Sequence, residues 1–188
     1  MTATIATAAA CNAAGPPTPP RGPDTGTPGT GVPTAWPLPA DASAAAAKAG
    51  LQMLGEEKLT VHYHAHLDVI VRGNRIQVPA FIGIDRAKQK ITALHTHDTS
   101  GIVHIESADD VPFTLGQVFT EWGQPLSTTQ LGPVTAAAGE VVRVYRNGNQ
   151  TSDMGALRLA AHDEIVVWLG PSGSMPNVPK AYDFPAGL

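Results

Sequence analysis

The strongest constraint on this chain is the alternating stretch "LTVHYHAHLDVIV" between Leu59 and Val71. Successive side chains of a β-strand point to opposite faces, so an alternating pattern of this length predicts a strand. The core face would collect Val61, Tyr63, Ala65, Leu67, Val69 and Val71. The other face would carry three imidazoles and a carboxylate, from His62, His64, His66 and Asp68.

Other stretches extend this β-rich pattern. Gly73-Asn74 and Asn147-Gly148 are typical of two-residue hairpin turns, and residues 162–170 resemble a further apolar strand. Thr114, Gln117 and Gly123 fit the capping box and the stop of a helix over 111–123. The predicted fold class is therefore α+β and β-rich, with antiparallel hairpins forming a sheet or a small barrel or sandwich beside one or two helices.

The chain divides into four predicted parts. Residues 1–11 resemble part of a secretion signal, because "TAAAC" is similar to a bacterial lipoprotein cleavage box in which Cys11 would be lipidated. Residues 12–40 are rich in Pro and Gly and predict a disordered linker. Residues 41–55 predict a helix capped by Asp41, and 56–188 predict a histidine-rich β domain. This organisation predicts an extracytoplasmic protein, secreted or anchored to the membrane by lipid.

Bulk properties narrow the function classes. The formal net charge is −4 and no basic stripe is present, so nucleic acid is not an expected partner. The chain has no apolar run near the length of a membrane-spanning helix. A single cysteine excludes an internal disulfide.

Histidines are concentrated in two places, and the second is "LHTHDTSGIVHIE" (94–106). A two- or four-residue turn around 98–101 places His95 directly opposite His104. His97 and Glu106 then lie on the same face as this pair. A three- or five-residue turn would break this pairing.

Clustered neutral imidazoles favour a borderline divalent cation, so the sequence predicts a Cu(II) or Zn(II) site. Fe(II), held by two histidines and Asp98 or Glu106, ranks third. The first candidate ligands are His95, His97 and His104, and the second set is His62, His64 and His66. Asp68 and Glu106 are predicted outer-shell partners that orient imidazoles. Whether the two sets form one site or two is left open.

The leading functional hypothesis is a non-enzymatic metal-binding protein for sequestration, delivery or sensing. A metalloenzyme is the first alternative, with an open metal position that activates water or dioxygen and with Glu106 or Asp98 as general base. The second alternative is a metal-free structural or interaction domain. His162 precedes a strand and is predicted to be a turn residue rather than a ligand.

The combination "HYHAHLDVIV", "VPAFIGI", "LHTHDTSGIVHIES", "FTLGQVFTEWGQPL" and "FPAGL" resembles a group of uncharacterised exported bacterial proteins that share a histidine-rich β domain. The resemblance covers roughly residues 60–188. It implies a secreted or membrane-anchored domain, and it implies neither a reaction nor a particular metal.

Overall fold

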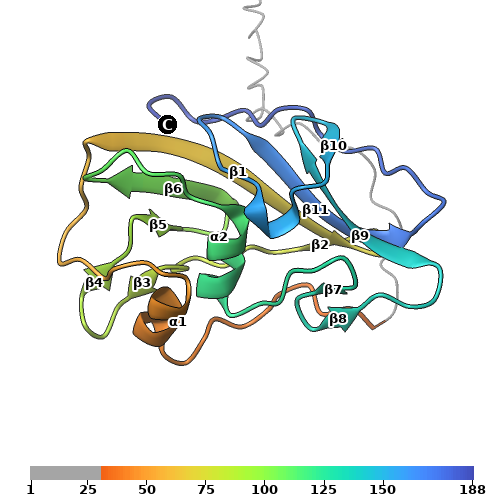
Figure 1. The fold of residues 1–188 in the computed structure, drawn as a ribbon, viewed down its shortest axis with the longest axis horizontal. Coiled ribbons are helices and arrows are strands. Elements are labelled where there is room, and N and C mark those ends of the chain that lie inside the picture. Colours follow the sequence, from red (N-terminus) through yellow and green to blue (C-terminus); the bar gives the residue numbers. More distant parts are fainter. Residues whose placement is uncertain (1–30) are drawn as a thin grey trace, which may run out of the picture.

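The computed structural model describes residues 31–188, and a mixed β-sheet organises this part of the chain (Figure 1). The strand order is β10-β9-β11-β1-β6-β5, and β2 pairs with β1 beside this path. These strands are β1 (Val61–Val71), β2 (Asn74–Ile76), β5 (Leu94–His95), β6 (Ile102–Ser107), β9 (Glu140–Arg146), β10 (Asn149–Thr151) and β11 (Glu164–Pro171). Two small two-stranded sheets lie outside it, formed by β3 (Ile84–Asp85) with β4 (Lys90–Ile91) and by β7 (Gln130–Leu131) with β8 (Val134–Thr135). Pairing is mostly antiparallel and the sheet does not close into a barrel, so the predicted α+β fold is confirmed in its open-sheet form.

Strand β1 runs through the centre of the sheet and alternates as predicted. Its odd-numbered residues, from Tyr63 to Val71, belong to the main hydrophobic core or pack against it. Its even positions face the other side of the sheet. β1 pairs antiparallel with β6 and β2, and parallel with β11.

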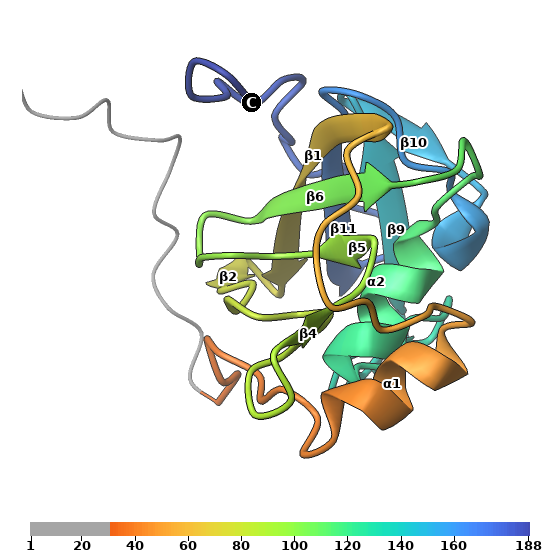
Figure 2. The same ribbon diagram turned by 90° about the vertical axis from the view of Figure 1, so that its left-hand side faces the viewer.

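Two helices lie on one side of the sheet, one against it and the other packed on the first (Figures 1 and 2). Helix α2 (Leu115–Trp122) has the predicted capping box between Thr114 and Gln117 and ends at Gly123, which has φ 72°. Helix α1 (Ala42–Lys48) starts at the predicted cap, where Asp41 accepts a hydrogen bond from the Ala44 amide. It is shorter than the predicted 41–55, because Gly50 at φ 71° follows its last turn. A short 3-10 helix, η1 (Met154–Ala156), packs beside α2.

Both predicted hairpin turns are present, one of them shifted by a residue. Asn147-Gly148 joins β9 to β10 with φ values of 52° and 79°, as a type I′ turn requires. The turn between β1 and β2 is Arg72-Gly73 rather than Gly73-Asn74, since Val71 pairs with Asn74. This placement puts glycine at the second loop position, the position it occupies in Asn-Gly turns.

The opposite face of the sheet is covered in part by the segment after β11, residues 172–188 (Figure 2). Tyr145, Val166 and Trp168 form a second small hydrophobic cluster there, and Val178 of the C-terminal segment packs against it. The Tyr182 ring stacks on His66 with ring centroids 3.8 Å apart. The remainder of this face carries the other histidines of β1, β6 and β5.

The predicted linker over 12–40 does not extend to residue 40. Trp36 is only 3% exposed, lies 5.4 Å from the Trp122 ring, and belongs to the main core. Burying a large aromatic ring fixes this stretch against the domain. The proposed lipidation site Cys11 and the segment 1–30 lie outside the described residues. Within residues 31–188, no helix is long and apolar enough to cross a membrane.

Candidate metal centre

Three neighbouring strands place one histidine each in a row across the sheet. His95 of β5 pairs with His104 of β6, and His104 pairs with His64 of β1. The predicted His95–His104 pairing is therefore confirmed. The turn that sets this pairing is held by Asp98, which accepts a hydrogen bond from the Ser100 amide at 2.8 Å.

The imidazoles of this row converge together with that of His97. Nε2 of His95 lies 3.1 Å from Nε2 of His97, and Nε2 of His64 lies 3.1 Å from Nδ1 of His104. His95, His97, His104 and Glu106 each offer one ligand atom, and these atoms lie within 4.8 Å of one another. His62, His64 and Glu106 form a second group, whose ligand atoms also lie within 4.8 Å of one another. The two predicted histidine sets therefore meet in one cluster, with the exception of His66, which belongs to another group.

Glu106 belongs to both groups. It pairs with His62 across β1 and β6, and its side chain is almost fully buried. Its Oε1 lies 3.4 Å from Nδ1 of His104 and 3.5 Å from Nε2 of His62, while its Oε2 lies 3.9 Å from Nε2 of His95. Oε2 has no hydrogen-bond partner among the residues described here. A buried carboxylate oxygen facing imidazole nitrogen atoms is suited to a cation.

A hydrogen bond to a backbone carbonyl oxygen fixes the orientation of the His95 ring. Its Nδ1 lies 2.9 Å from the Thr92 carbonyl oxygen, and this oxygen can only accept a hydrogen bond. Nδ1 therefore carries the proton, and Nε2 presents its lone pair to the cluster. This is the arrangement in which an imidazole with a backbone carbonyl partner is prepared to bind a metal ion.

Burial favours the neutral form of three cluster imidazoles, those of His64, His95 and His104. It lowers the pKa of His95 to about 3 and that of His104 to about 4, and neighbouring imidazoles add to both effects. The pKa of His64 is lowered for the same reason. Burial and the nearby Glu57 raise the pKa of the Glu106 carboxyl group. Neutral nitrogen atoms of this kind are the form of histidine that binds metal.

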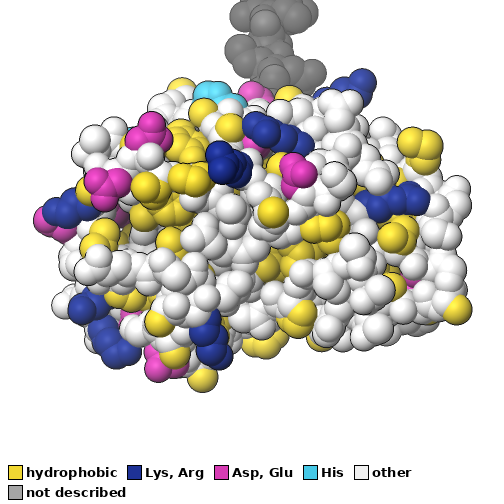
Figure 3. Space-filling view, viewed as in Figure 1, with side chains coloured by type: hydrophobic (Ala, Val, Ile, Leu, Met, Phe, Trp, Pro, Cys, Tyr) yellow, Lys and Arg dark blue, Asp and Glu magenta, His cyan; other side chains and the backbone are white. Residues whose placement is uncertain are grey.

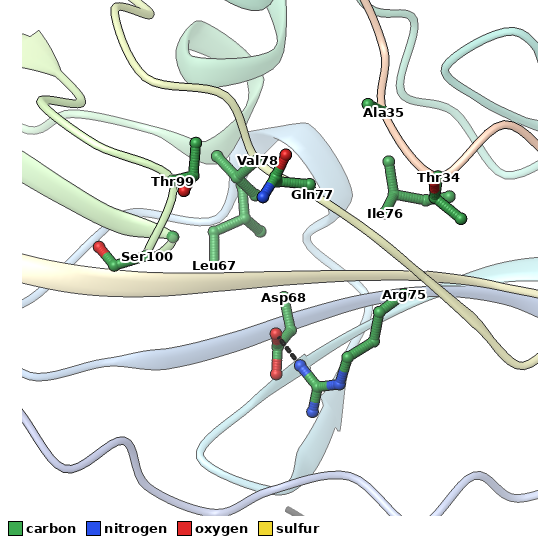
Figure 4. Close-up of a pocket in the computed structure, with 11 residues that line it drawn as sticks. Thr34, Ala35, Leu67, Asp68, Arg75, Ile76, Gln77, Val78, Thr99 and Ser100 are labelled. Atoms are coloured by element: carbon green, nitrogen blue, oxygen red, sulfur yellow. Dashed lines mark hydrogen bonds and ion pairs between the residues drawn. The ribbon is translucent and has the colours of Figure 1, made fainter. Parts of the chain in front are cut away.

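His66 and Asp68 lie apart from this cluster. Nδ1 of His66 contacts the Glu164 carboxylate at 2.7 Å and its Nε2 contacts the Ser100 carbonyl oxygen at 3.0 Å, so both ring nitrogen atoms are engaged. Asp68 forms an ion pair with Arg75, and Figure 4 shows the two side chains pointing toward each other. His66, Asp68 and Glu164 nevertheless form a third group whose ligand atoms lie within 4.8 Å of one another. Asp68 thus neighbours His66 rather than the imidazoles of β5 and β6.

The remaining candidates have local roles. Asp98 is exposed and caps its own turn, and hydrogen bonds to Ser100 lower its pKa. It is in none of the three groups. His162 has φ 59° in the turn before β11, and its Nε2 lies 3.2 Å from the Leu188 carbonyl oxygen, so it is a turn residue as predicted.

Two acidic residues that contact histidines, and a third that is buried in α2, were not identified from the sequence. Glu57, in the loop before β1, has Oε1 3.6 Å from Nε2 of His97. Glu164 arrives from β11 to contact His66. Glu121 of α2 is only 2% exposed, and burial raises its pKa to about 8 against a smaller opposing effect of Thr92. Its place in helix α2, one residue before Trp122, is the only indication the sequence gives of its burial.

Two hollows lie beside the Asp68–Arg75 pair. The larger, about 420 Å³, lies between β1, β2 and the 99–101 turn, where Leu67 and Asp68 point to opposite sides of β1 (Figure 4). The second, about 280 Å³, is lined by His66, Glu164 and Tyr182 among others. Neither hollow is lined by the five cluster histidines. On the face viewed in Figure 3, histidine surface shows only as a small area at the upper edge.

No protein-family model matches the chain, and no curated protein or solved structure matches it either. The functional assignment therefore depends on the geometry of the site. The resemblance of residues 60–188 to exported bacterial proteins stays a prediction.

Proposed function

We propose that this protein binds a divalent transition-metal ion, Cu(II) or Zn(II), outside the cytoplasm, for sequestration, delivery or sensing. The observation that carries the proposal is the convergence of His95, His97, His104 and Glu106, whose ligand atoms lie within 4.8 Å of one another. Burying neutral imidazoles this close costs each ring hydration, and a cation bound by the nitrogen lone pairs would offset that cost.

The donor set supports the choice of metal. The cluster consists of imidazole nitrogen atoms and one carboxylate, with no thiolate, which suits Cu(II) and Zn(II). Binding is favoured over turnover by the position of the two hollows, which lie away from the five histidines. The extracytoplasmic location is supported by the lipoprotein-like "TAAAC" stretch and the Pro/Gly-rich segment that follows it.

The test is metal content and affinity. Untagged full-length protein is analysed for bound elements, stripped with chelator, and titrated with Zn(II) and Cu(II) by calorimetry. His95→Ala and His104→Ala are each expected to weaken binding at least about tenfold, because each removes a ligand. His162→Ala is the matched control, since it removes an imidazole outside the cluster and should bind as the wild type does. Absence of both bound metal and uptake in the wild-type protein would contradict the proposal.

A further inference from the structure

The cluster contains more ligands than one ion uses. Five imidazoles and the Glu106 carboxylate meet on one face of the sheet, whereas a tetrahedral ion takes four ligands. If one ion is held by His95, His97, His104 and Glu106, then His62 and His64 are left over. These two histidines are nevertheless integrated in the cluster, because Nε2 of His64 lies 3.1 Å from Nδ1 of His104.

Glu106 connects the two parts. Its Oε1 lies 3.4 Å from His104 and 3.5 Å from His62, and its Oε2 lies 3.9 Å from His95, so one carboxylate reaches imidazoles of both sets. A carboxylate in this position can bind one ion through each oxygen. Two ions about 3.5–4 Å apart are the usual spacing of such paired sites.

We infer that the cluster is a dinuclear centre in which Glu106 bridges two divalent transition-metal ions. One ion is held by His95, His97 and His104, and the other by His62 and His64. This inference rests on the proposed function and adds the number of ions and their bridge.

The two positions are unequal. The first has three histidines and one Glu106 oxygen, which completes a four-ligand shell. The second has two histidines and the other oxygen, which leaves room for an exogenous oxygen ligand such as water or a small anion. Each set contains one half-exposed side chain, His97 at 45% in the first and His62 at 41% in the second, so the number of protein ligands rather than exposure distinguishes the second ion. It is therefore expected to bind more weakly and to exchange faster.

The third group takes no part in this centre. Both ring nitrogen atoms of His66 are engaged by Glu164 and Ser100, and Asp68 is paired with Arg75. An ion there would have to displace these contacts. The two-ion count therefore refers to His62, His64, His95, His97, His104 and Glu106 alone.

The experiment counts ions and measures their coupling. Stripped protein is titrated with Zn(II) by calorimetry, and the retained metal is counted after gel filtration. Two equivalents are expected for the wild type and for the control His162→Ala, with the second equivalent weaker. His62→Ala is expected to retain one equivalent, and Glu106→Gln is expected to weaken the second ion at least about tenfold. With two equivalents of Cu(II), coupling through the carboxylate should reduce the integrated electron paramagnetic resonance intensity below that of two isolated ions.

The outcomes separate this inference from the proposed function. Zero equivalents in the wild type overturn both. One equivalent that is unchanged by His62→Ala leaves the proposed function standing and overturns the dinuclear centre. Two equivalents with full, uncoupled Cu(II) intensity overturn the bridge. If Glu106→Gln does not fold, as judged by circular dichroism, the wild-type coupling and His62→Ala still decide the question.

Discussion

At the scale of single residues, some side chains of the cluster pair with residues nearby in the sequence, and others pair with residues far away in it. The pairing of His95 with His104 follows from one short turn, so it could be predicted. The pairing of His64 with His104 requires β1 to lie beside β6, and the sequence left that contact open. His66 leaves the cluster because Glu164 reaches it from β11, and no local pattern indicates that contact.

Glu121 provides a residue-scale prediction about pH. Burial raises its pKa from the ordinary 4.5 to about 8, so between these values the folded state holds a proton that the unfolded chain releases. The contribution of Glu121 to stability should therefore fall as the pH rises from 4.5 to 8. Glu121→Gln keeps the shape and removes the titration. At pH 8 it should raise the free energy of unfolding by about 1–3 kcal/mol, with little change at pH 4.5.

Urea denaturation of both proteins across this pH range checks the prediction. A variant whose advantage is the same at pH 4.5 and pH 8 would show that the proton of Glu121 is not the cause. A variant less stable than the wild type at pH 8 would show that the ionised carboxylate has partners that compensate its burial.

At the scale of elements, local chemistry predicted where α2 begins and ends better than it predicted how strands associate. The Thr114–Gln117 capping box and Gly123 define α2 from neighbouring residues. The parallel pairing of β1 with β11 joins segments that are about a hundred residues apart. Hairpin signals in the sequence predict only neighbouring antiparallel strands, so they could not predict this pairing. The end of α1 was predicted too late because Gly50 stops the helix before Gly55.

Two glycines in turns give an element-scale prediction with a built-in control. Gly73 has φ 82° and open space where a Cβ would stand, so Gly73→Ala costs only left-handed strain of about 1–2 kcal/mol. Gly101 has φ 91°, and a Cβ there would lie 2.7 Å from the Leu67 carbonyl oxygen and 2.9 Å from Nε2 of His66. Gly101→Ala therefore adds a clash and should cost about 2–5 kcal/mol in total.

Urea denaturation again provides the measurement. Gly101→Ala should also weaken metal binding, because the 98–101 turn sets the His95–His104 pairing and must shift away from β1. Equal losses of stability in the two variants would show that the turn absorbs the added methyl group without moving.

At the scale of the whole molecule, the C-terminal segment covers part of the sheet face that the helices leave open. Trp168 is 6% exposed because residues after β11 cover its cluster, and Tyr182 stacks on His66. Deleting residues 172–188 should therefore expose Trp168 and lower the melting temperature by about 2–4 °C for each kcal/mol lost.

Differential scanning calorimetry and binding of a hydrophobic fluorescent dye measure these effects. Met175→Ala is the control within the same segment, since Met175 is 88% exposed and its loss should change neither quantity. If the truncated protein has the melting temperature of the wild type and binds no dye, the segment does not protect the sheet.

The parallel pairing of β1 with β11 also has a consequence for synthesis. The chain leaves the ribosome from its N-terminus, so the strand that fills the gap between β1 and β9 is the last strand to emerge. Until then β1 presents an open edge that can pair with other nascent chains. The β5–β6–β1 part of the sheet, with all five cluster histidines, is complete by Ser107. This half of the sheet can therefore pair before the strand that fills its centre is available.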